Sequence, residues 1–397
     1  MDSFLSFKHP YPINRKYTQK VAYFSMEFAI DQALKIYSGG LGYLAGSHMR
    51  SAFDLKQNLI GIGILWKYGY YDQTRNSTGE MDVLFMERHY NFLIDTGIEF
   101  EIPVNNHHVK VKAYYLPPHV FGSAPVFLLS TNHPDNDYLA QTISHRLYSN
   151  NTEAKIAQSI LLGRGGAKLL DLIGYRPDIY HLNEAHALPA AFYLYEKLGV
   201  LDEVKNKMAF TTHTPVEAGN EKHDIFQLEK MSFFGTVPLD EVRQIKKIDD
   251  NVFNHSLAAL RLSKIANGVS KLHGVVAREM WGGFDEICPI THITNSQNHL
   301  YWHDPELDRA MDKNDNAAFS KRKKELKQQL FQIVADQTGK IFDPDVLTLV
   351  WARRYAGYKR ADLITRDIAR FERLVYHSKY PIQIIWAGKP YPMDYDA

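Results

Sequence analysis

The chain alternates short apolar runs with amphipathic stretches of helical spacing, and this alternation limits its fold more than any other feature. Strands are predicted for the apolar run at 21–28, which contains no breaker, and for the strand-like runs at 59–73, 177–184, 207–214 and 287–295. The stretch 151–174 predicts a long helix that Asn151 or Thr152 caps and Gly174 ends. Strands that alternate with helices imply βαβ units and a parallel sheet, so we expect an α/β fold.

Three segments add to this pattern. Residues 80–130 alternate around proline and glycine, which predicts a β-rich insertion. The stretch 255–281, "HSLAALRLSKIANGVSKLHGVVAREMW", predicts one or two helices. The charged stretch 319–330 predicts a helix face exposed to solvent.

The strand–helix–strand pattern restarts after residue 342. One such unit is too small to bury a sheet face alone, so it either docks on the first domain or begins something longer. We therefore expect one α/β lobe over residues 1–342 and the incomplete start of a second over 343–397.

Composition excludes several classes of protein. The chain has 46 basic and 45 acidic side chains and a net charge of +1, which gives no general attraction to nucleic acid or an anionic membrane. Its one cysteine, Cys288, forms no intrachain disulfide, and neither a leader peptide nor an apolar run of about 20 residues is evident. A cytoplasmic protein is expected, with a homo-oligomer left open.

Three glycines lie between the first strand and the next helix, in "YSGGLG". Ligands of open α/β sheets bind outside the carboxyl ends of the strands, and a helix N-terminus suits a phosphate or a sugar hydroxyl. The spacing of Gly39, Gly40 and Gly42 is not G-x-G-x-x-G, so a dinucleotide site is poorly supported. A tight turn with close helix–strand packing explains the glycines equally well.

Polar side chains end two further strands. In "YHLNEAH", Asn183, Glu184 and His186 could bind a polyhydroxyl ligand or cap a helix. In "AFTTHT", His213 is either a site residue or a buried histidine satisfied by backbone. The spacing of His181 and His186 matches no zinc motif, and no metal site is predicted.

The strongest cluster of positive charge is "WARRYAGYKR", which holds Arg353, Arg354 and Lys359 at the exit of a strand. Guanidinium groups bind phosphate in bidentate fashion, and lysine adds a compact charge. The cluster therefore predicts a phosphate site that the two lobes close upon, unless it is only a solvated basic turn.

Nine ordered segments resemble the α-glucan (glycogen, starch and maltodextrin) phosphorylases, most closely the short microbial branch. They span residues 21 to 392 and include "VAYFSMEF", "YSGGLGYLAG", "YHLNEAHA", "AFTTHTPVEAGNE", "HITNS" and "WARRYAGYKRADL". No G-x-S-x-G elbow, P-loop or C-x-x-C motif is present.

The resemblance implies a glycosyltransferase of the GT-B type, built from two facing Rossmann-like lobes. It implies reversible phosphorolysis of α-1,4-glucan or maltodextrin by inorganic phosphate, giving glucose 1-phosphate with retention at the anomeric carbon. It also implies pyridoxal 5'-phosphate, which acts through its phosphate group rather than as an electron sink.

The resemblance also assigns roles to residues. The binding site for the sugar and the phosphate would be lined by Gly39, Gly40 and Leu41. The terminal glucose would contact the backbone carbonyl of His213. The matching cleft motifs contribute Asn183, Glu184, His186 and Asn295. Arg354 would hold the attacking phosphate beside Arg353, and Lys359 would lie between that phosphate and the cofactor, which Gly40 also approaches.

Some positions depart from the family pattern. Ser47 replaces a usual Asp, and Ser296 replaces a Gly in a turn expected to need positive φ. Gly357 and Ala29 stand where longer members carry functional side chains. The family's G-T-G-N-M-K-like motif, which carries the cofactor lysine, is absent, so residues 1–397 alone are expected to be inactive.

Two rival functions stay open at this stage. A sugar-nucleotide-dependent glucosyltransferase such as glycogen synthase shares the two-lobe design and a glycine loop after its first strand. A non-catalytic glucan-binding relative would suit the substitutions at Ser47 and Ser296. The donor that the protein binds discriminates between these alternatives.

Overall fold

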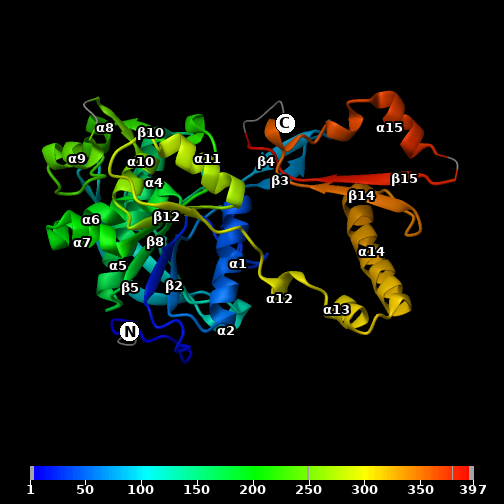
Figure 1. The fold of residues 1–397 in the computed structure, drawn as a ribbon, viewed down its shortest axis with the longest axis horizontal. Helices are drawn as coiled ribbons and strands as arrows, with labels where there is room; N and C mark the ends of the chain where they lie inside the picture. Colours follow the sequence, from blue (N-terminus) through cyan, green and yellow to red (C-terminus); the bar gives the residue numbers. More distant parts are fainter. Residues whose placement is uncertain (1–3, 248–249, 378, 393–397) are drawn as a thin grey trace. The chain divides into compact units, whose positions relative to one another are not determined.

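A computed structural model describes residues 4–247, 250–377 and 379–392. The chain divides into two compact units (Figure 1). The first contains the residues up to Asp72 together with Leu84–Asn298, and the second contains Gln73–Val83 and the residues from His299 onward.

The first unit is built on a nine-stranded sheet with the strand order β13-β12-β9-β8-β1-β2-β7-β6-β5. Its strands are β1 Val21–Phe24, β2 Leu59–Ile64, β5 Ile94–Val104, β6 His107–Leu116, β7 Val126–Ser130, β8 Ile179–Asn183, β9 Met208–Thr212, β12 Ile265–Gly268 and β13 Ile290–His292. Every pairing from β13 to β7 is parallel, and only the pairings of β6 with its neighbours are antiparallel. The predicted α/β class with a large parallel sheet is confirmed.

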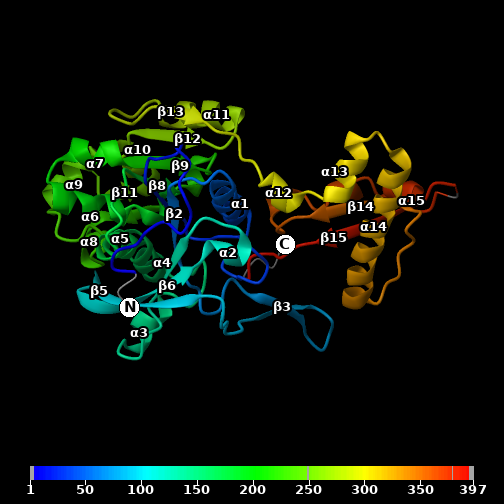
Figure 2. The same cartoon turned by 90° about the horizontal axis from the view of Figure 1, so that it is seen from below.

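Helices cover both faces of this sheet (Figure 1, Figure 2). The helices of this unit are α1 Gly40–Asp54, α2 Pro118–Phe121, α3 Tyr138–Thr142, α4 Thr152–Ile160, η1 Leu161–Gly165, α5 Gly166–Leu172, η2 Ala185–Ala187, α6 Pro189–Leu198, α7 Leu201–Lys207, η3 Glu217–Gly219, α8 Ile225–Lys230, α9 Leu239–Lys246, α10 His255–Arg261 and α11 Lys271–Trp281. The small ladder of β10 Lys222–Asp224 and β11 Val252–Asn254 lies among them.

The strand β2 shows why two layers of helix are needed. A Cβ on Gly61 would lie 2.9 Å from Cε of Met49 in α1, whereas a Cβ on Gly166 in α5 would lie 2.6 Å from Cγ2 of Ile62. Successive residues of a strand point to opposite faces, so α1 and α5 pack on opposite sides of β2. All six residues of β2 are buried as a result.

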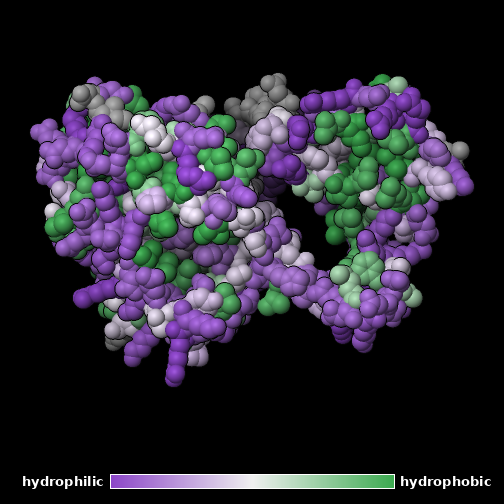
Figure 3. Space-filling model, in the orientation of Figure 1, coloured by the Kyte–Doolittle hydropathy of each residue, from purple (hydrophilic) through white to green (hydrophobic). Residues whose placement is uncertain are grey.

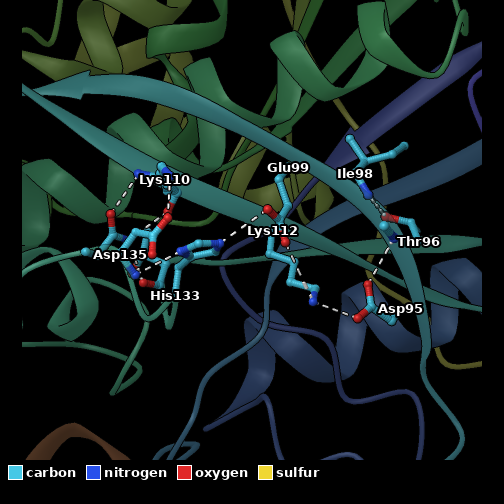
Figure 4. A network of polar contacts seen from close by, with 11 residues as sticks. Asp95, Thr96, Ile98, Glu99, Lys110, Lys112, His133 and Asp135 are labelled. Atoms are coloured by element: carbon cyan, nitrogen blue, oxygen red, sulfur yellow. Dashed lines mark hydrogen bonds and ion pairs between the residues drawn. The ribbon is translucent and has the colours of Figure 1, made fainter.

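The predicted β-rich insertion is present as strands, but β5, β6 and β7 extend the main sheet. The outer face of the β5–β6 hairpin carries a polar network (Figure 4). There the Lys112 ammonium lies 2.7 Å from the Asp95 carboxylate, and the imidazole of His133 lies 3.3 Å from the Glu99 carboxylate. The Lys112–Asp95 pair is partly exposed and contributes about 1 kcal/mol at most, so the buried alternate face of the hairpin stabilises it.

The helix predicted over 151–174 is present as α4, η1 and α5 in succession. Asn151 caps it by accepting a hydrogen bond from the backbone N–H of Ala154 (2.9 Å), and Gly174 ends it with φ 67°. The five residues of η1 form a π-helical turn, which a sequence pattern does not reveal.

The stretch 255–281 was predicted to form one or two helices, and it forms two, α10 and α11. The sequence pattern missed the strand β12 between them, which pairs with β9 and β13. Four residues are too few for a clear strand pattern beside two helices. The strand forms because its backbone completes the ladder between two neighbours distant in sequence.

The second unit contains a parallel pair of strands, β14 Leu347–Ala352 and β15 Ile382–Ala387, joined through α15 Ile368–Val375. Its other elements are β3 Asp72–Arg75, β4 Met81–Leu84, α12 His299–Trp302, α13 Pro305–Asp312, α14 Asn316–Thr338, η4 Gly357–Lys359 and η5 Leu363–Thr365. The predicted strand–helix–strand pattern is present, and residues 393–397 of the predicted second lobe lie outside the described residues. The two strands carry exposed apolar side chains, among them Leu347, Val350 and Trp386. Figure 3 shows an apolar surface over this unit.

The units divide the chain after Asn298, whereas the predicted lobes were placed on either side of residue 342. The helix α14 belongs with the second unit because its lysines bind the segment that leads into β14. The Lys327 ammonium donates to the carbonyl of Pro344 (2.8 Å), and Lys324 pairs with Asp345 (2.8 Å). As the sequence indicates, α14 is largely exposed, with Phe331 as its buried contact.

Candidate active site

A buried carboxylate fixes the loop that leads into α1. Glu27 follows β1, and its Oε2 accepts hydrogen bonds from the backbone N–H groups of Ser38 (2.6 Å) and Gly39 (3.0 Å). Its Oε1 accepts a hydrogen bond from the hydroxyl of Tyr148 (2.6 Å). Sequence reasoning missed both Glu27 and Tyr148, although one acidic residue in the apolar run "VAYFSMEF" already implies buried partners.

The glycines of the loop serve two different purposes. A Cβ on Gly42 would lie 2.7 Å from Oε2 of Glu27, and one on Gly46 would lie 1.9 Å from the carbonyl oxygen of Ala29. A Cβ on Gly39 or Gly40 would meet nothing within 4 Å. Gly42 and Gly46 therefore permit close packing, whereas Gly39 and Gly40 leave bare backbone beside open space.

That bare backbone is the amino-terminal end of a 15-residue helix. Gly39 is the N-cap of α1; its own N–H donates to the Glu27 carboxylate (3.0 Å), and the first turn from Gly40 onward holds no acidic residue. The amide groups of a first turn lack partners within the helix and carry partial positive charge. This end of α1 can therefore bind a hydroxyl or an anion.

Three of the predicted residues lie close together at the carboxyl ends of β8 and β9. Asn183 donates a hydrogen bond from Nδ2 to the hydroxyl of Ser25 (3.1 Å), and its Oδ1 lies 2.7 Å from Nε2 of His213. The carboxylate of Glu184 accepts hydrogen bonds from the backbone N–H of His213 and the hydroxyl of Thr214. The neighbouring parallel strands thus bring Asn183, Glu184 and His213 together, although the sequence placed them in two separate motifs.

Glu184 occupies a rare backbone conformation, with φ 64° and ψ 173°. This region is almost confined to glycine, so a glutamate there costs on the order of 1–3 kcal/mol and persists only where surrounding structure enforces it. Burial raises the pKa of the Glu184 carboxyl to about 7, even though hydrogen bonds from His213 and Thr214 act to lower it. Near neutral pH this group can therefore either donate or accept a proton.

A pocket of about 180 Å³ lies beside these residues in the first unit. Its lining consists of Leu41, Tyr148, Glu184, Ala185, His186, Thr214, Gly219, Glu221, His255 and Ser256. It thereby brings the predicted Leu41, Glu184 and His186 together. The volume is below the roughly 300–1,000 Å³ of a drug-sized ligand site, which suits one sugar ring or one small polar group.

The histidines of the pocket are hydrogen-bonding groups rather than cations. Burial lowers the pKa of His255 to about 4 and also lowers that of His186. Within the described residues, Nδ1 of His186 is buried without a hydrogen-bond partner. Because the lining carries no lysine or arginine, the pocket favours sugar hydroxyls over a fully charged phosphate.

Two predicted features of this edge lie outside the pocket lining. Asn295 follows β13, is exposed, and donates its backbone N–H to the carbonyl of Val269 (2.9 Å). Ser296 was expected in a turn that needs positive φ, but its φ is not positive. Its replacement of glycine therefore introduces no backbone strain.

The predicted cations belong to the second unit. Arg353 and Arg354 directly follow β14, and Lys359 ends the short helix η4. The backbone N–H of Arg353 donates to the carbonyl of Ala387 (3.0 Å), and the Lys359 ammonium lies 5.1 Å from the ring centre of Tyr358. The strand-exit position agrees with the sequence analysis, and the expected approach to the glycine loop stays a prediction.

The sheet and its polar edge define an α/β protein with a candidate ligand site at the carboxyl ends of parallel strands. No protein-family model matches the chain. An uncharacterized protein of Methanocaldococcus jannaschii is 47% identical over 375 residues, which covers 94% of this chain and 71% of that protein. The chain belongs to one family with that protein.

Relatives with named activities follow at lower identity. The maltodextrin phosphorylase of Thermococcus litoralis is 33% identical and the glycogen phosphorylase of Mycobacterium tuberculosis 30% identical, over 96% and 94% of this chain. The chain spans about half the length of these two relatives, 52% in each case. These similarities support a place in the phosphorylase family.

Proposed function

We propose that this chain carries the glucan-binding part of an α-glucan phosphorylase. The reaction would be the reversible phosphorolysis of α-1,4-glucan to glucose 1-phosphate, with retention at the anomeric carbon. The observation that carries the proposal is the pocket that joins Leu41, after the open glycines, to Glu184 and His186. The similarity to named phosphorylases supports the same class of glycosyltransferase.

In this proposal the pocket binds a glucosyl unit through its hydroxyl groups. Glu184 and the free Nδ1 of His186 supply hydrogen-bonding groups inside the pocket. We assign the contact with the terminal glucose to the backbone carbonyl of His213, because its amide already binds Glu184 and its ring binds Asn183. Asn183 then holds the ring of His213 and does not itself touch the sugar.

The phosphate would be held by charges from two sources. The amino-terminal end of α1 at Gly40 offers partial positive charge, which the Glu27 carboxylate at Gly39 offsets in part, and the pocket lining adds no cation. We therefore assign the remaining charge to Arg353, Arg354 and Lys359, in a two-lobe GT-B arrangement. Phosphate is a weak nucleophile, so positioning and charge stabilisation contribute most to its transfer.

Pyridoxal phosphate is proposed as the cofactor, and when bound it would supply a second phosphate group to the reaction. A Cβ on Gly40 would meet nothing within 4 Å, so open space borders the backbone that the cofactor is expected to approach. A G-T-G-N-M-K-like lysine motif does not occur in the sequence, so the attachment of the cofactor is not explained by these residues. The roles given above to the chain's own residues do not depend on it.

Binding of maltoheptaose by residues 1–397, measured by isothermal titration calorimetry, tests the site. We expect saturable binding that His186→Ala and Glu184→Gln each weaken at least tenfold. Glu203→Gln, on the exposed surface of α7, is the matched control and should bind as the wild type does. Absence of saturable binding, or equal binding by all variants, would overturn the proposed site.

The reaction is tested on the whole gene product with maltoheptaose, inorganic phosphate and pyridoxal phosphate. Release of glucose 1-phosphate is the expected result. Glucosyl transfer from ADP-glucose or UDP-glucose instead would favour the sugar-nucleotide-dependent rival. Glucan binding without either reaction would favour a non-catalytic glucan-binding relative.

A further inference from the structure

Two histidines and one aspartate gather at the start of the second unit, away from the candidate active site. His299 and His303 are four residues apart, and the backbone N–H of His303 donates to the carbonyl of His299 (3.0 Å). One helical turn therefore places both rings on the same side, with their centres 4.8 Å apart. Asp308 of α13 approaches both rings from the following helix.

We propose that His299, His303 and Asp308 form a binding site for a divalent transition metal, with Zn²⁺ as the ion that fits best. One ligand atom from each residue lies within 4.8 Å of the other two. Oδ2 of Asp308 is 2.5 Å from Nδ1 of His303 and 3.7 Å from Nε2 of His299. Tetrahedral Zn²⁺ with bonds of about 2.0–2.1 Å separates its ligand atoms by about 3.3 Å, so small side-chain rotations suffice.

The backbone that carries Asp308 is held in place by its neighbours. Asp304 caps α13 by accepting hydrogen bonds from the N–H groups of Glu306 and Leu307. The same carboxylate pairs with Arg322 of α14 (2.8 Å), and the N–H of Asp308 donates to the carbonyl of Asp304 (3.1 Å). Asp304 is thereby committed to structure, and Asp308 is positioned to coordinate the ion.

The ligand chemistry selects the class of ion. Imidazole nitrogens suit Zn²⁺, Cu²⁺ and Ni²⁺, whereas Mg²⁺ and Ca²⁺ prefer sites made only of oxygen ligands. The side chain of His299 is 77% exposed, so water can reach the ion and complete its coordination. Two neutral imidazoles and one carboxylate leave a bound Zn²⁺ with a net charge of +1.

The position of the site suggests a structural role. The preceding residue, Asn298, is the last of the first unit, where its side chain donates to Ser51 (3.0 Å) and Asp54 (2.8 Å). The next residue is His299. A metal ion bound by His299, His303 and Asp308 would link α12 to α13 directly after the chain leaves that unit. This site is independent of the proposed phosphorolysis and would exist whichever sugar reaction the protein performs.

The test is titration of the tag-free, chelator-treated protein with ZnCl₂, followed by calorimetry and by the absorption of bound Co²⁺. We expect one equivalent to bind, with affinity reduced at least tenfold by His299→Ala and by His303→Ala. His89→Ala is the matched control, because His89 is also exposed and lies 3.7 Å from the Glu87 carboxylate, but among the described residues it belongs to no group of three metal-ligating side chains. This variant should bind Zn²⁺ as the wild type does.

Circular dichroism of each variant verifies folding, which the exposed His299 side chain should not disturb. Three results would overturn the proposal. These are no saturable binding of Zn²⁺, unchanged binding by both histidine variants, or a preference for Mg²⁺ over Zn²⁺.

Discussion

Replacing Gly46 and Gly40 by alanine separates the packing glycines from those that face the ligand. The added Cβ at position 46 would lie 1.9 Å from the carbonyl oxygen of Ala29 and 2.3 Å from its carbon, whereas real Cβ contacts stay beyond 3.0 Å. The obstacle is backbone, and it is tied to α1 because the N–H of Ala29 donates to the carbonyl of Gly42 (2.9 Å). To relieve this contact, α1 must move by about 1 Å.

Overpacking of this kind costs about 1–3 kcal/mol, and a backbone obstacle places Gly46→Ala near the upper end. At about 2–4 °C per kcal/mol for domains of 150–250 residues, the melting temperature should fall by roughly 4–12 °C. Gly40→Ala meets nothing within 4 Å, so its free energy of unfolding should change by less than about 1 kcal/mol. Its affinity for glucose 1-phosphate should nevertheless fall about tenfold or more, because the methyl group occupies the space that is assigned to a phosphate group.

Thermal unfolding followed by circular dichroism, with calorimetric titration of glucose 1-phosphate, measures both effects on the same preparations. A wild-type melting temperature for Gly46→Ala would refute the packing argument. Unchanged affinity for glucose 1-phosphate in Gly40→Ala, with the fold intact, would refute the assignment of open backbone to ligand binding.

Two further predictions concern buried charges. Burial raises the pKa of the Glu184 carboxyl from 4.5 to about 7. The protonated carboxyl therefore contributes its full stabilisation of the folded state below pH 4.5, and this stabilisation is lost as the pH rises to about 7. Glu184→Gln removes this loss because glutamine does not ionise. Urea denaturation should therefore show the variant gaining up to about 3 kcal/mol on the wild type between these pH values, at 1.36 kcal/mol per pKa unit, and a pH-independent difference would contradict it. Glu196 pairs with the buried Arg164 (2.6 Å), so Glu196→Ala should cost about 3–5 kcal/mol by leaving that charge without its carboxylate. The double variant Arg164→Met, Glu196→Ala should recover much of this loss in urea denaturation, and a purely additive result would argue against the pair.

Much of the first unit follows from local sequence. The runs that become β1, β2, β8, β9 and β13 are short and apolar, and each is bounded by turn or polar residues, so their pattern indicates buried parallel strands. The cap at Asn151 and the left-handed Gly174 are likewise local features that fix the two ends of one long helical stretch. These elements could be predicted because neighbours in sequence determine them.

Other features depend on partners far away in the chain. The strand β12 forms because β9 and β13 offer it hydrogen-bonding edges on both sides, so a pattern read over a few residues favoured helix. The helix α14 belongs with the second unit because Lys327 reaches the segment before β14. A sequence pattern gives the type of an element, and such long-range contacts decide with which neighbours it packs.

The sequence by itself determined that glycines and polar residues end the strands of a parallel sheet, which places a candidate site at one edge. Only the tertiary structure decided the role of each glycine. A Cβ on Gly42 would contact Glu27 and one on Gly46 would contact Ala29, whereas one on Gly40 would meet nothing within 4 Å. It also brought Tyr148, 121 residues away in the chain, to the carboxylate that holds the loop. The physical reason is that the position of a glycine in the sequence does not show which atoms lie where a side chain would otherwise be. Only folding brings those atoms, from distant parts of the chain, next to the glycine.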